Sequence, residues 1–353
     1  MDKIRIGTRG SKLALKQAFL VQEALRKADG MIETEIVVVH TKGDKIQDRP
    51  LSEIGDKGVF ASELEQALRD GQIDIAVHSA KDLPMDLADG LSVAAVLPRG
   101  DVRDVLVIPE GGRMPLPAGR EQETVQSSGR GMNAMESAGY LDRGVNVGKV
   151  ANVLERSFVI GSGSKRRQQL ASQRWENVVF ENIRGNVDTR LRKLKDGSSD
   201  GIIYDGIILA KAGLDRLGIG SEREEGLEFY PLPPEQFLPA ACQAIIAVEA
   251  VQDSVPAKLC RKITDSETEL CFLVEREVLA QLAADCSEAA AAWCRQEKDG
   301  LTLDAMYAGN RERLVCVTAS YAGEMEEDRA EQLRAGWAMA REAAKTVAGI
   351  ESS

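Results

Sequence analysis

The chain has 353 residues, of which 43% are hydrophobic and 29% charged, a composition that allows two or three soluble domains with sizeable cores. Its formal net charge of −11 argues against a nucleic-acid surface, which needs a basic field, so we expect no nucleic acid as a partner. No apolar run approaches the roughly 20 residues that span a bilayer, and the start M-D-K-I-R-I-G has no signal-peptide segment. We therefore expect no membrane partner and a cytoplasmic location.

The first hundred residues alternate short apolar runs with amphipathic stretches. The expected elements are a strand at 3–6, a helix marked by Ala14, Ala18, Val21 and Leu25, a strand at 35–39, a helix marked by Phe60, Leu64 and Leu68, and strands at 73–77 and 93–97. This β-α-β-α order predicts a mostly parallel sheet with helices on its faces.

The pattern then starts again and predicts a second α/β unit. Its strands are expected at 105–108, 159–161, 178–180 and 207–210, with helices that begin near 165 and 186. Between the first two of these strands, residues from about 109 to 157 are polar, rich in Gly, Arg, Ser and Asn, and poorly periodic, so we interpret them as an insertion.

The last hundred residues predict a small α+β domain. A helix near 267–282 leads to Cys286, short strands are expected at 301–303 and 315–318, and a final helix carries apolar residues from Ala330 to Val347 at alternating spacings of three and four.

Polar clusters follow the ends of predicted strands, where open α/β sheets bind their ligands. They are TRGS at 8–11, HSAKD at 78–82, SGSKRRQ at 162–168 and RGNVDTR at 184–190. The last two open helices, whose N-terminal amides favour anions. Convergence of these clusters would place the following cations in one cleft: Arg9, Lys81, Arg166, Arg167, Arg184 and Arg190.

Such a cleft would bind a ligand with several negative charges, because an arginine fork holds a carboxylate or phosphate in a bidentate manner. The carboxylate of Asp82 stands among these cations and could stabilise a developing positive charge or accept an N–H. Each cluster taken alone is more typical of a helix cap, a turn or a solvated face, and His78 is more typical of a structural histidine. The residues by themselves therefore indicate a two-lobed anion-binding protein of undetermined chemistry.

The six cysteines all lie at or beyond residue 242, none forms a C-x-x-C pair, and the chain has only two histidines. We therefore expect neither a metal site nor a disulfide framework. One cysteine could be a reactive thiol, and composition does not determine which.

Taken together, the clusters resemble the porphobilinogen deaminase (hydroxymethylbilane synthase) family over nearly the whole chain. The matching stretches are IGTRGSKLAL at 6–15, HTKGD at 40–44, GDKGVF at 55–60, ELE at 63–65, DIAVHSAKDLP at 74–84, SKRRQ at 164–168, RGNVDTR at 184–190 and LAKAGLDRL at 209–217. The insertion and the C-terminal domain match less well.

The resemblance implies an α/β fold with two lobes like those of periplasmic binding proteins, built on mixed, mostly parallel sheets, and a small α+β C-terminal domain. The expected division is 1–98 with 244–262 for lobe 1, 103–238 for lobe 2, and 266–353 for the C-terminal domain, with crossovers near 98–103 and 238–244.

The resemblance also implies a transferase of tetrapyrrole and heme biosynthesis. The family joins four porphobilinogen molecules head to tail, with loss of ammonia, on a covalent dipyrromethane cofactor, and hydrolysis releases hydroxymethylbilane. Each pyrrole carries an acetate and a propionate, which agrees with the cationic clusters. A monomer is expected, as is a hand-over of the product to uroporphyrinogen-III synthase.

Residue roles follow from the same resemblance. Asp82 is expected to be the catalytic carboxylate, and Cys286 the attachment point of the dipyrromethane through a thioether. Phe60 is expected to lie over the cleft. The cofactor and substrate are expected to contact Arg9, Ser11, Lys57, Ser79, Lys81, Ser164, Arg166, Arg167, Arg184 and Arg190.

Two alternatives remain open at this stage. A non-catalytic two-lobed homologue that binds a polyanion or pyrrole would need neither Asp82 nor Cys286, and the effector domain of a transcription factor is a weaker third possibility. The chain also departs from the family where the usual Gly-Gln-Gly after the second crossover reads Cys242-Gln243-Ala244.

Overall fold

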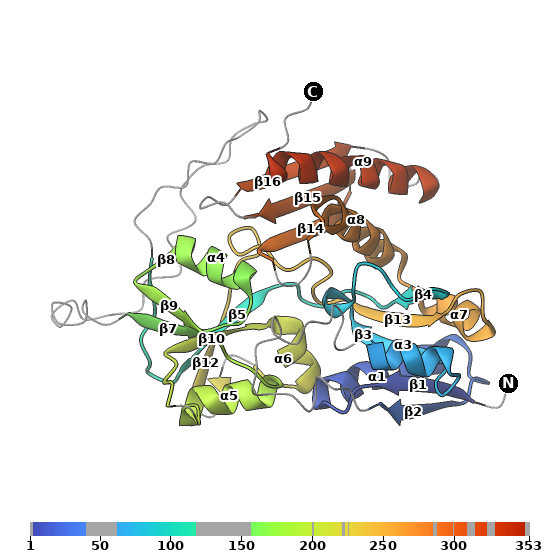
Figure 1. Cartoon of the computed structure of the whole chain (residues 1–353), viewed down its shortest axis with the longest axis horizontal. Helices are drawn as coiled ribbons and strands as arrows, with labels where there is room; N and C mark the ends of the chain where they lie inside the picture. Colours follow the sequence, from blue (N-terminus) through green and yellow to red (C-terminus); the bar gives the residue numbers. More distant parts are fainter. Residues whose placement is uncertain are drawn as a thin grey trace.

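The computed structural model describes residues 3–39, 62–117, 157–199, 201–220, 223–224, 226–284, 288–298, 300–308, 315–322 and 329–349. Two mixed sheets lie side by side, and a smaller antiparallel sheet with two long helices covers the region where they meet (Figure 1).

The first sheet has the strand order β2-β1-β3-β13-β4. Its strands are β1 (Ile4–Thr8), β2 (Thr34–Val38), β3 (Ile75–Ser79), β4 (Leu91–Val96) and β13 (Ile246–Val251). β1 pairs in parallel with β2 and β3, whereas β13 runs antiparallel between β3 and β4. The helices packed on it include α1 (Lys12–Ala28), α3 (Ser62–Arg69) and α7 (Val255–Cys260), followed by the 3-10 turn Arg261–Ile263.

Three residues of the stripe predicted on α1, namely Ala18, Val21 and Leu25, are fully buried in the core of this sheet, whereas Ala14 at its start is partly exposed. Burial of one apolar face holds the helix against β1 and β3, so that its N-terminus lies at the carboxyl end of the sheet.

The second sheet has the order β11-β12-β5-β10-β7-β9. Its strands are β5 (Asp104–Pro109), β7 (Phe158–Gly161), β9 (Val178–Glu181), β10 (Gly206–Ala210), β11 (Arg223–Glu224) and β12 (Leu227–Pro231). Three helices accompany it, namely α4 (Lys165–Arg174), α5 (Val187–Asp196) and α6 (Lys211–Leu217), and a short pair joins β6 (Leu116–Pro117) to β8 (Trp175–Glu176).

The third sheet is the antiparallel meander β14 (Ala290–Glu297), β15 (Gly300–Tyr307) and β16 (Val315–Ala322), covered by α8 (Ser266–Leu282) and α9 (Arg329–Ala348). Its apolar cluster extends to Ala80 and Leu83 in the first sheet's loops. This small α+β unit thus packs against the loop that follows β3.

Two chain segments connect the larger sheets, and they run next to one another. The amide of Gly100 donates to the carbonyl of Ala244 at 3.2 Å, and Nε of Arg99 donates to the carbonyl of Gln243 at 2.9 Å. These segments coincide with the crossovers expected near 98–103 and 238–244. The second returns the chain to the first sheet as β13.

The mixed α/β class with a small α+β unit is confirmed, with one correction on strand direction. In the described part of each larger sheet, antiparallel pairings are at least as numerous as parallel ones, because β13 and β5 insert antiparallel to their neighbours. Three parts of the prediction lie outside the described residues. They are the stretch HTKGD at 40–44, the stretch GDKGVF at 55–60 with Phe60, and most of the 109–157 insertion.

Over these same described ranges, no helix combines the length and the apolar character that crossing a membrane requires.

Candidate active site

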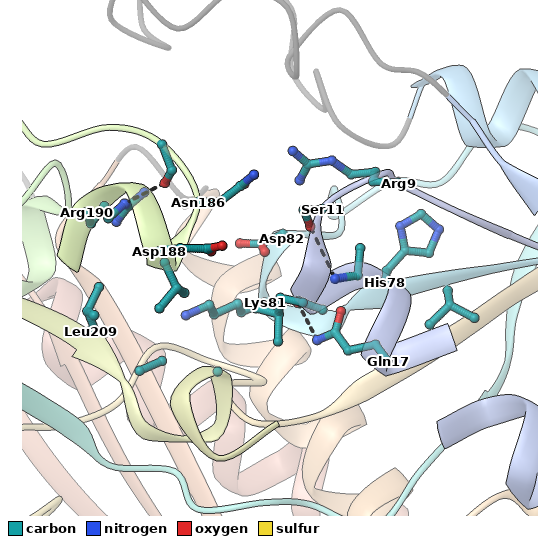
Figure 2. A pocket seen from close by; sticks show the side chains of 18 of the residues that line it. Arg9, Ser11, Gln17, His78, Lys81, Asp82, Asn186, Asp188, Arg190 and Leu209 are labelled. Carbon is teal, nitrogen blue, oxygen red and sulfur yellow. Dashed lines mark hydrogen bonds between the residues drawn. The ribbon is translucent and has the colours of Figure 1, made fainter. Parts of the chain in front are cut away.

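A cavity of about 230 Å³ lies where the carboxyl end of the first sheet faces the second sheet. All four polar clusters that follow predicted strand ends contribute to its wall. The predicted site residues in that wall are Arg9, Ser11, Ser79, Lys81, Asp82, Arg167 and Arg190. Figure 2 shows Lys81 and Asp82 in the middle, with Arg9 and Ser11 on one side and Asp188 and Arg190 on the other.

The turn that carries Asp82 is anchored at both ends. β3 ends at Ser79 and continues into a single 3-10 turn, Ala80–Asp82. Its first residue, Ala80, and the residue after it, Leu83, are buried in the core of the third sheet. The amide of Ala80 donates to the carbonyl of Ile245 at 3.0 Å. Because the apolar neighbours point into the core, Lys81 and Asp82 are left to face the cavity, and Asp82 is exposed to it.

Lys81 is held from the second crossover. Its Nζ donates to Oε1 of Gln243 at 3.1 Å. Burial, followed by the nearby Arg167 charge, lowers the pKa of Lys81 from 10.5 to about 8, although the carboxylates of Asp82 and Asp104 oppose this shift. Lys81 is therefore an ammonium that a small environmental change can neutralise.

Arg190 comes from α5, and a tight turn before that helix holds it. Its Nε donates to the carbonyl of Gly185 at 2.8 Å. Gly185 has φ +108, and a Cβ there would lie 2.7 Å from Cγ2 of Thr189, so only glycine fits. Burial, with the charge of Arg167, lowers the pKa of Arg190 to about 10, while Asp82 acts in the opposite direction.

The serines in the cavity wall support its backbone. Oγ of Ser11 accepts from the amide of Ala14 at 3.2 Å and caps α1. Oγ of Ser79 accepts from Nε2 of Gln17 at 2.9 Å. These contacts fix the first turn of α1 against the end of β3.

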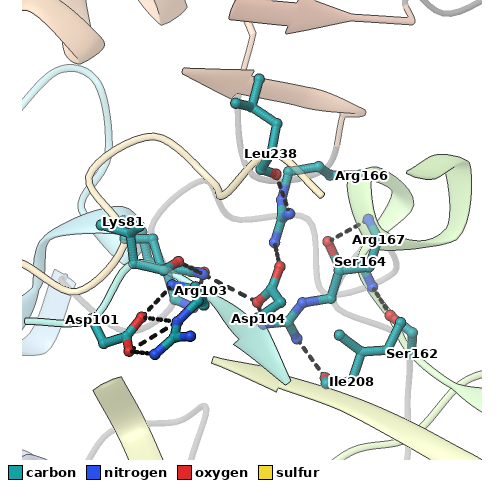
Figure 3. Close-up of polar contacts among 12 residues, drawn as sticks. Lys81, Asp101, Arg103, Asp104, Ser162, Ser164, Arg166, Arg167, Ile208 and Leu238 are labelled. Atoms are coloured by element: carbon teal, nitrogen blue, oxygen red, sulfur yellow. Dashed lines mark hydrogen bonds and ion pairs between the residues drawn. The ribbon is translucent and has the colours of Figure 1, made fainter. Parts of the chain in front are cut away.

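Arg166 and Arg167 are buried around Asp104, the first residue of β5. Nη2 of Arg166 donates to Oδ2 of Asp104 at 2.8 Å, and Nη2 of Arg167 donates to Oδ1 at 2.7 Å (Figure 3). Burial opposes ionisation of Asp104, but the charges of Arg166, Arg167 and Lys81 and the Arg167 hydrogen bond outweigh it and hold its pKa well below its usual range. Arg166 also donates to the carbonyl of Leu238 at 2.6 Å.

The structure does not bring every predicted residue to the cavity. Ser164, Arg166 and Arg184 are not in its wall, and Ser164 instead caps α4 by accepting from the amide of Arg167. Arg166 supports Arg167 through their shared partner Asp104. Lys57 and Cys286 lie outside the described residues.

His78 also lines the cavity, but its Nε2 lies 3.0 Å from Oε2 of Glu249, a fully buried residue of β13. This contact agrees with the interpretation of His78 as a structural residue. In the parts of the chain that the structure describes, no group of three or more His, Cys, Asp or Glu side chains could hold a metal ion.

Sequence reasoning missed several residues of the site. Gln17 and Asp188 line the cavity, and Lys12 at the start of α1 makes a 2.8 Å ion pair with Asp188 on α5. Gln243 and Asp104 lie behind the wall. A charged residue at the head of the apolar strand at 105–108 was the available signal for Asp104, whereas nothing local in the sequence indicates Gln243.

Comparison with known proteins decides the family. Residues 4–258 match the family described as "Porphobilinogen deaminase, dipyromethane cofactor binding domain". The chain belongs to the porphobilinogen deaminase family. It is 36% identical over 334 residues to the porphobilinogen deaminase of Streptococcus sanguinis, covering 94% of each chain. Over 311 residues it is 37% identical to that of a Roseiflexus species, covering 88% of this chain and 87% of the relative.

Solved structures show only distant likeness. The substrate-binding domain of a putative molybdenum ABC transporter from Clostridium difficile aligns with a TM-score of 0.36 at 10% identity, over 76% of this chain and 92% of that one. A reduced form of OxyR from N. meningitidis aligns with a TM-score of 0.35 at 11% identity, over 74% and 92%.

The described side chains fit the dipyrromethane cofactor that the family binds. A dipyrromethane carries carboxylate groups and pyrrole N–H donors. The cavity offers cationic groups from Arg9, Lys81, Arg167 and Arg190 to the first and the Asp82 carboxylate to the second.

Proposed function

We propose that this protein is a transferase, hydroxymethylbilane synthase, which joins four porphobilinogen molecules head to tail and releases hydroxymethylbilane. Each addition breaks the carbon–nitrogen bond of an incoming porphobilinogen, releases ammonia, and forms a carbon–carbon bond to the terminal pyrrole, which loses a proton. The observation that carries the proposal is the meeting of Asp82 with several cations in one cavity.

Asp82 is the residue to which we assign the chemistry. Loss of ammonia leaves positive charge on the pyrrole, and a fixed carboxylate stabilises that charge most effectively where little water competes. The same oxygens accept pyrrole N–H groups. The rigid turn between the buried Ala80 and Leu83 supports this role, because a carboxylate held in place needs no reorganisation as charge develops.

The surrounding cations are assigned to binding. Arg9, Lys81, Arg167 and Arg190 would hold the acetate and propionate groups of the substrate and the cofactor, and Arg166 would support Arg167 through Asp104. Ser11, Ser79 and Ser164 would fix the backbone around them. Lys57 and Arg184 remain predicted binding residues. Bound through Cys286, the dipyrromethane supplies the terminal pyrrole that is extended.

Intact mass and turnover of the purified protein test this function together. The wild type should exceed its sequence mass by one dipyrromethane and should consume porphobilinogen, and Cys286→Ser should show the bare mass and no turnover. Cys316→Ser is a matched control, because Cys316 lies on β16 of the third sheet and should leave both readouts unchanged. A bare wild-type mass with no consumption of porphobilinogen would refute the proposal.

The remaining assignments are proposals of the same kind. The order of strands within each sheet supports the division into 1–98 with 244–262, 103–238 and 266–353. The cytoplasmic location, the monomeric state and the hand-over to uroporphyrinogen-III synthase stay predictions. No observation favours a non-catalytic binding protein, and we do not propose one.

A further inference from the structure

Gln243 lies behind the cavity wall and links its two sides through one side chain. Its Oε1 accepts from Nζ of Lys81 at 3.1 Å. Its Nε2 donates to the carbonyl of Val102 at 2.8 Å and to Oδ1 of Asp104 at 3.1 Å. Both ends of the amide group are thereby hydrogen-bonded, and the residue has no exposed surface.

These contacts fix which way the amide points. Both Val102 O and Asp104 Oδ1 are acceptors, so the NH₂ end must face them and the oxygen end must face Lys81. Asp104 cannot donate a hydrogen bond to the amide oxygen of Gln243, because it is ionised between Arg166 and Arg167. The orientation of the Gln243 amide therefore follows from the buried ion pairs that Asp104 makes with Arg166 and Arg167.

The backbone around Gln243 is also constrained. Cys242 and Ala244 have φ values of 60° and 73°, in the left-handed region that favours glycine. The main-chain groups of the pair are engaged as well, since Glu275 accepts from the amide of Cys242 and Gly100 donates to the carbonyl of Ala244. A segment held in this strained form presents the buried side chain of Gln243 in a fixed place.

Lys81 faces the cavity, as does Arg167, and its charge depends on its burial and on its charged neighbours. Asp82 beside it and Asp104 on β5 favour the ammonium form, while Arg166 and Arg167 on α4 disfavour it. A neutral acceptor at 3.1 Å adds support for the charged form without adding charge.

We propose that Gln243 is a positioning residue, which places the Lys81 ammonium in the cavity and aligns it with the Asp104–Arg167 pair across the two sheets. The inference rests on the proposed function only for the identity of the anion that Lys81 meets. The contact itself requires no ligand, so it can be tested without one.

The first experiment measures the pKa of Lys81 by acetic anhydride labelling at a series of pH values, read by peptide mass spectrometry. Gln243→Met keeps the length of the side chain and removes the acceptor, so the labelling midpoint should move about one pH unit lower. Gln22→Met is the matched control, because Gln22 is a buried glutamine that donates to Thr34 at 2.9 Å, remote from Lys81. It should leave the midpoint unchanged.

The second experiment measures porphobilinogen turnover in a cycle of Gln243→Met, Lys81→Met and the double variant. Gln243→Met alone should raise KM about tenfold with a smaller effect on kcat, and it should have no further effect once Lys81 is gone. If Gln243→Met does not fold, Gln243→Asn, whose amide is one methylene too short to span the contacts, should move both readouts in the same direction.

The outcomes separate this inference from the proposed function. A wild type that does not consume porphobilinogen refutes the function, while a lowered Lys81 midpoint in the variant still supports the role of Gln243. An unchanged midpoint in a folded Gln243 variant, or equal effects of Gln243→Met with and without Lys81, would overturn the inference.

Discussion

Lys81 makes the anion affinity of the cavity sensitive to pH at the scale of a single residue. Its pKa of about 8 lies below that of Arg190, about 10, so Lys81 loses its charge first as the pH rises. Affinity for a carboxylated pyrrole should be level below pH 8 and fall above it, by up to about tenfold per unit until the pKa of the complex is reached. Lys81→Arg should move this fall to higher pH. A binding titration from pH 6.5 to 9.5 measures it.

Over the same pH range the contribution of Lys81 to the free energy of unfolding should rise while the anion affinity falls. The opposite directions distinguish the two effects. The unfolded chain keeps Lys81 protonated up to its ordinary pKa of 10.5. Between about pH 8 and 10.5 the unfolded state therefore binds more protons at this residue, and its contribution to the free energy of unfolding rises with pH. Affinity that stayed level through pH 9 would contradict the account of Lys81.

Which site residues could be predicted from sequence depended on their distance from a strand end. Asp82, Lys81, Arg9 and Arg190 follow predicted strands directly, so a rule about sheet edges was enough to bring them together. Arg166 and Arg167 are adjacent and look equivalent in the sequence, yet only Arg167 reaches the cavity. The distinction depends on Asp104, a partner some sixty residues away that no local pattern reveals.

At the scale of elements, the turn before α5 should be intolerant of any side chain. Gly185→Ala places a Cβ 2.7 Å from Thr189 and forces alanine to φ +108, which should cost about 1–3 kcal/mol of stability. Because the Gly185 carbonyl accepts from Nε of Arg190, KM for porphobilinogen should rise as well. Urea unfolding and steady-state kinetics measure the two effects.

The other end of the same helix supplies the control. Gly197 follows α5 with φ +84, so Gly197→Ala is also strained but lies away from the cavity wall. It should lower stability without changing KM. A rise in KM for both variants would indicate general loosening of the helix and would count against a specific role of the Gly185 turn.

Elements with local periodicity were predicted well, and elements defined by distant partners were not. α1 and α8 appear where their apolar spacing placed them. β13 is sequence-remote from β3 and β4, between which it inserts, and β14 begins with alanines that carry little strand preference. The prediction that the strands run mostly parallel was wrong for the same reason, because pairing over long sequence separations leaves no periodic signal.

At the scale of the whole molecule, Glu275 on α8 joins the two crossovers to the third sheet. Its fully buried carboxylate pairs with Arg99 of the first crossover at 2.5 Å, and it accepts from the amide of Cys242 in the second at 2.5 Å and from Cys294 on β14 at 2.8 Å. All three parts of the chain thus depend on one buried acceptor.

Glu275→Gln should lower the free energy of unfolding by about 3 kcal/mol, because it leaves the Arg99 charge buried without a counter-ion. Glu277→Gln on the same helix is the control, since its pair with Arg341 is near the surface. That pair should contribute about 1 kcal/mol or less, a value typical of exposed pairs. Urea denaturation compares the two variants. Equal losses in the free energy of unfolding would show that the buried contacts of Glu275 contribute no more than a surface ion pair.

In the proposed function Asp82 performs the chemistry, and the cations of the cavity only bind. Asp82→Asn tests it most directly, because it keeps the shape of the side chain and removes the charge, and the measurement is porphobilinogen turnover by protein whose intact mass is determined in parallel. The variant should keep the mass of the dipyrromethane while its turnover falls by at least about a hundredfold. Near-normal turnover in a variant that carries the cofactor would contradict it.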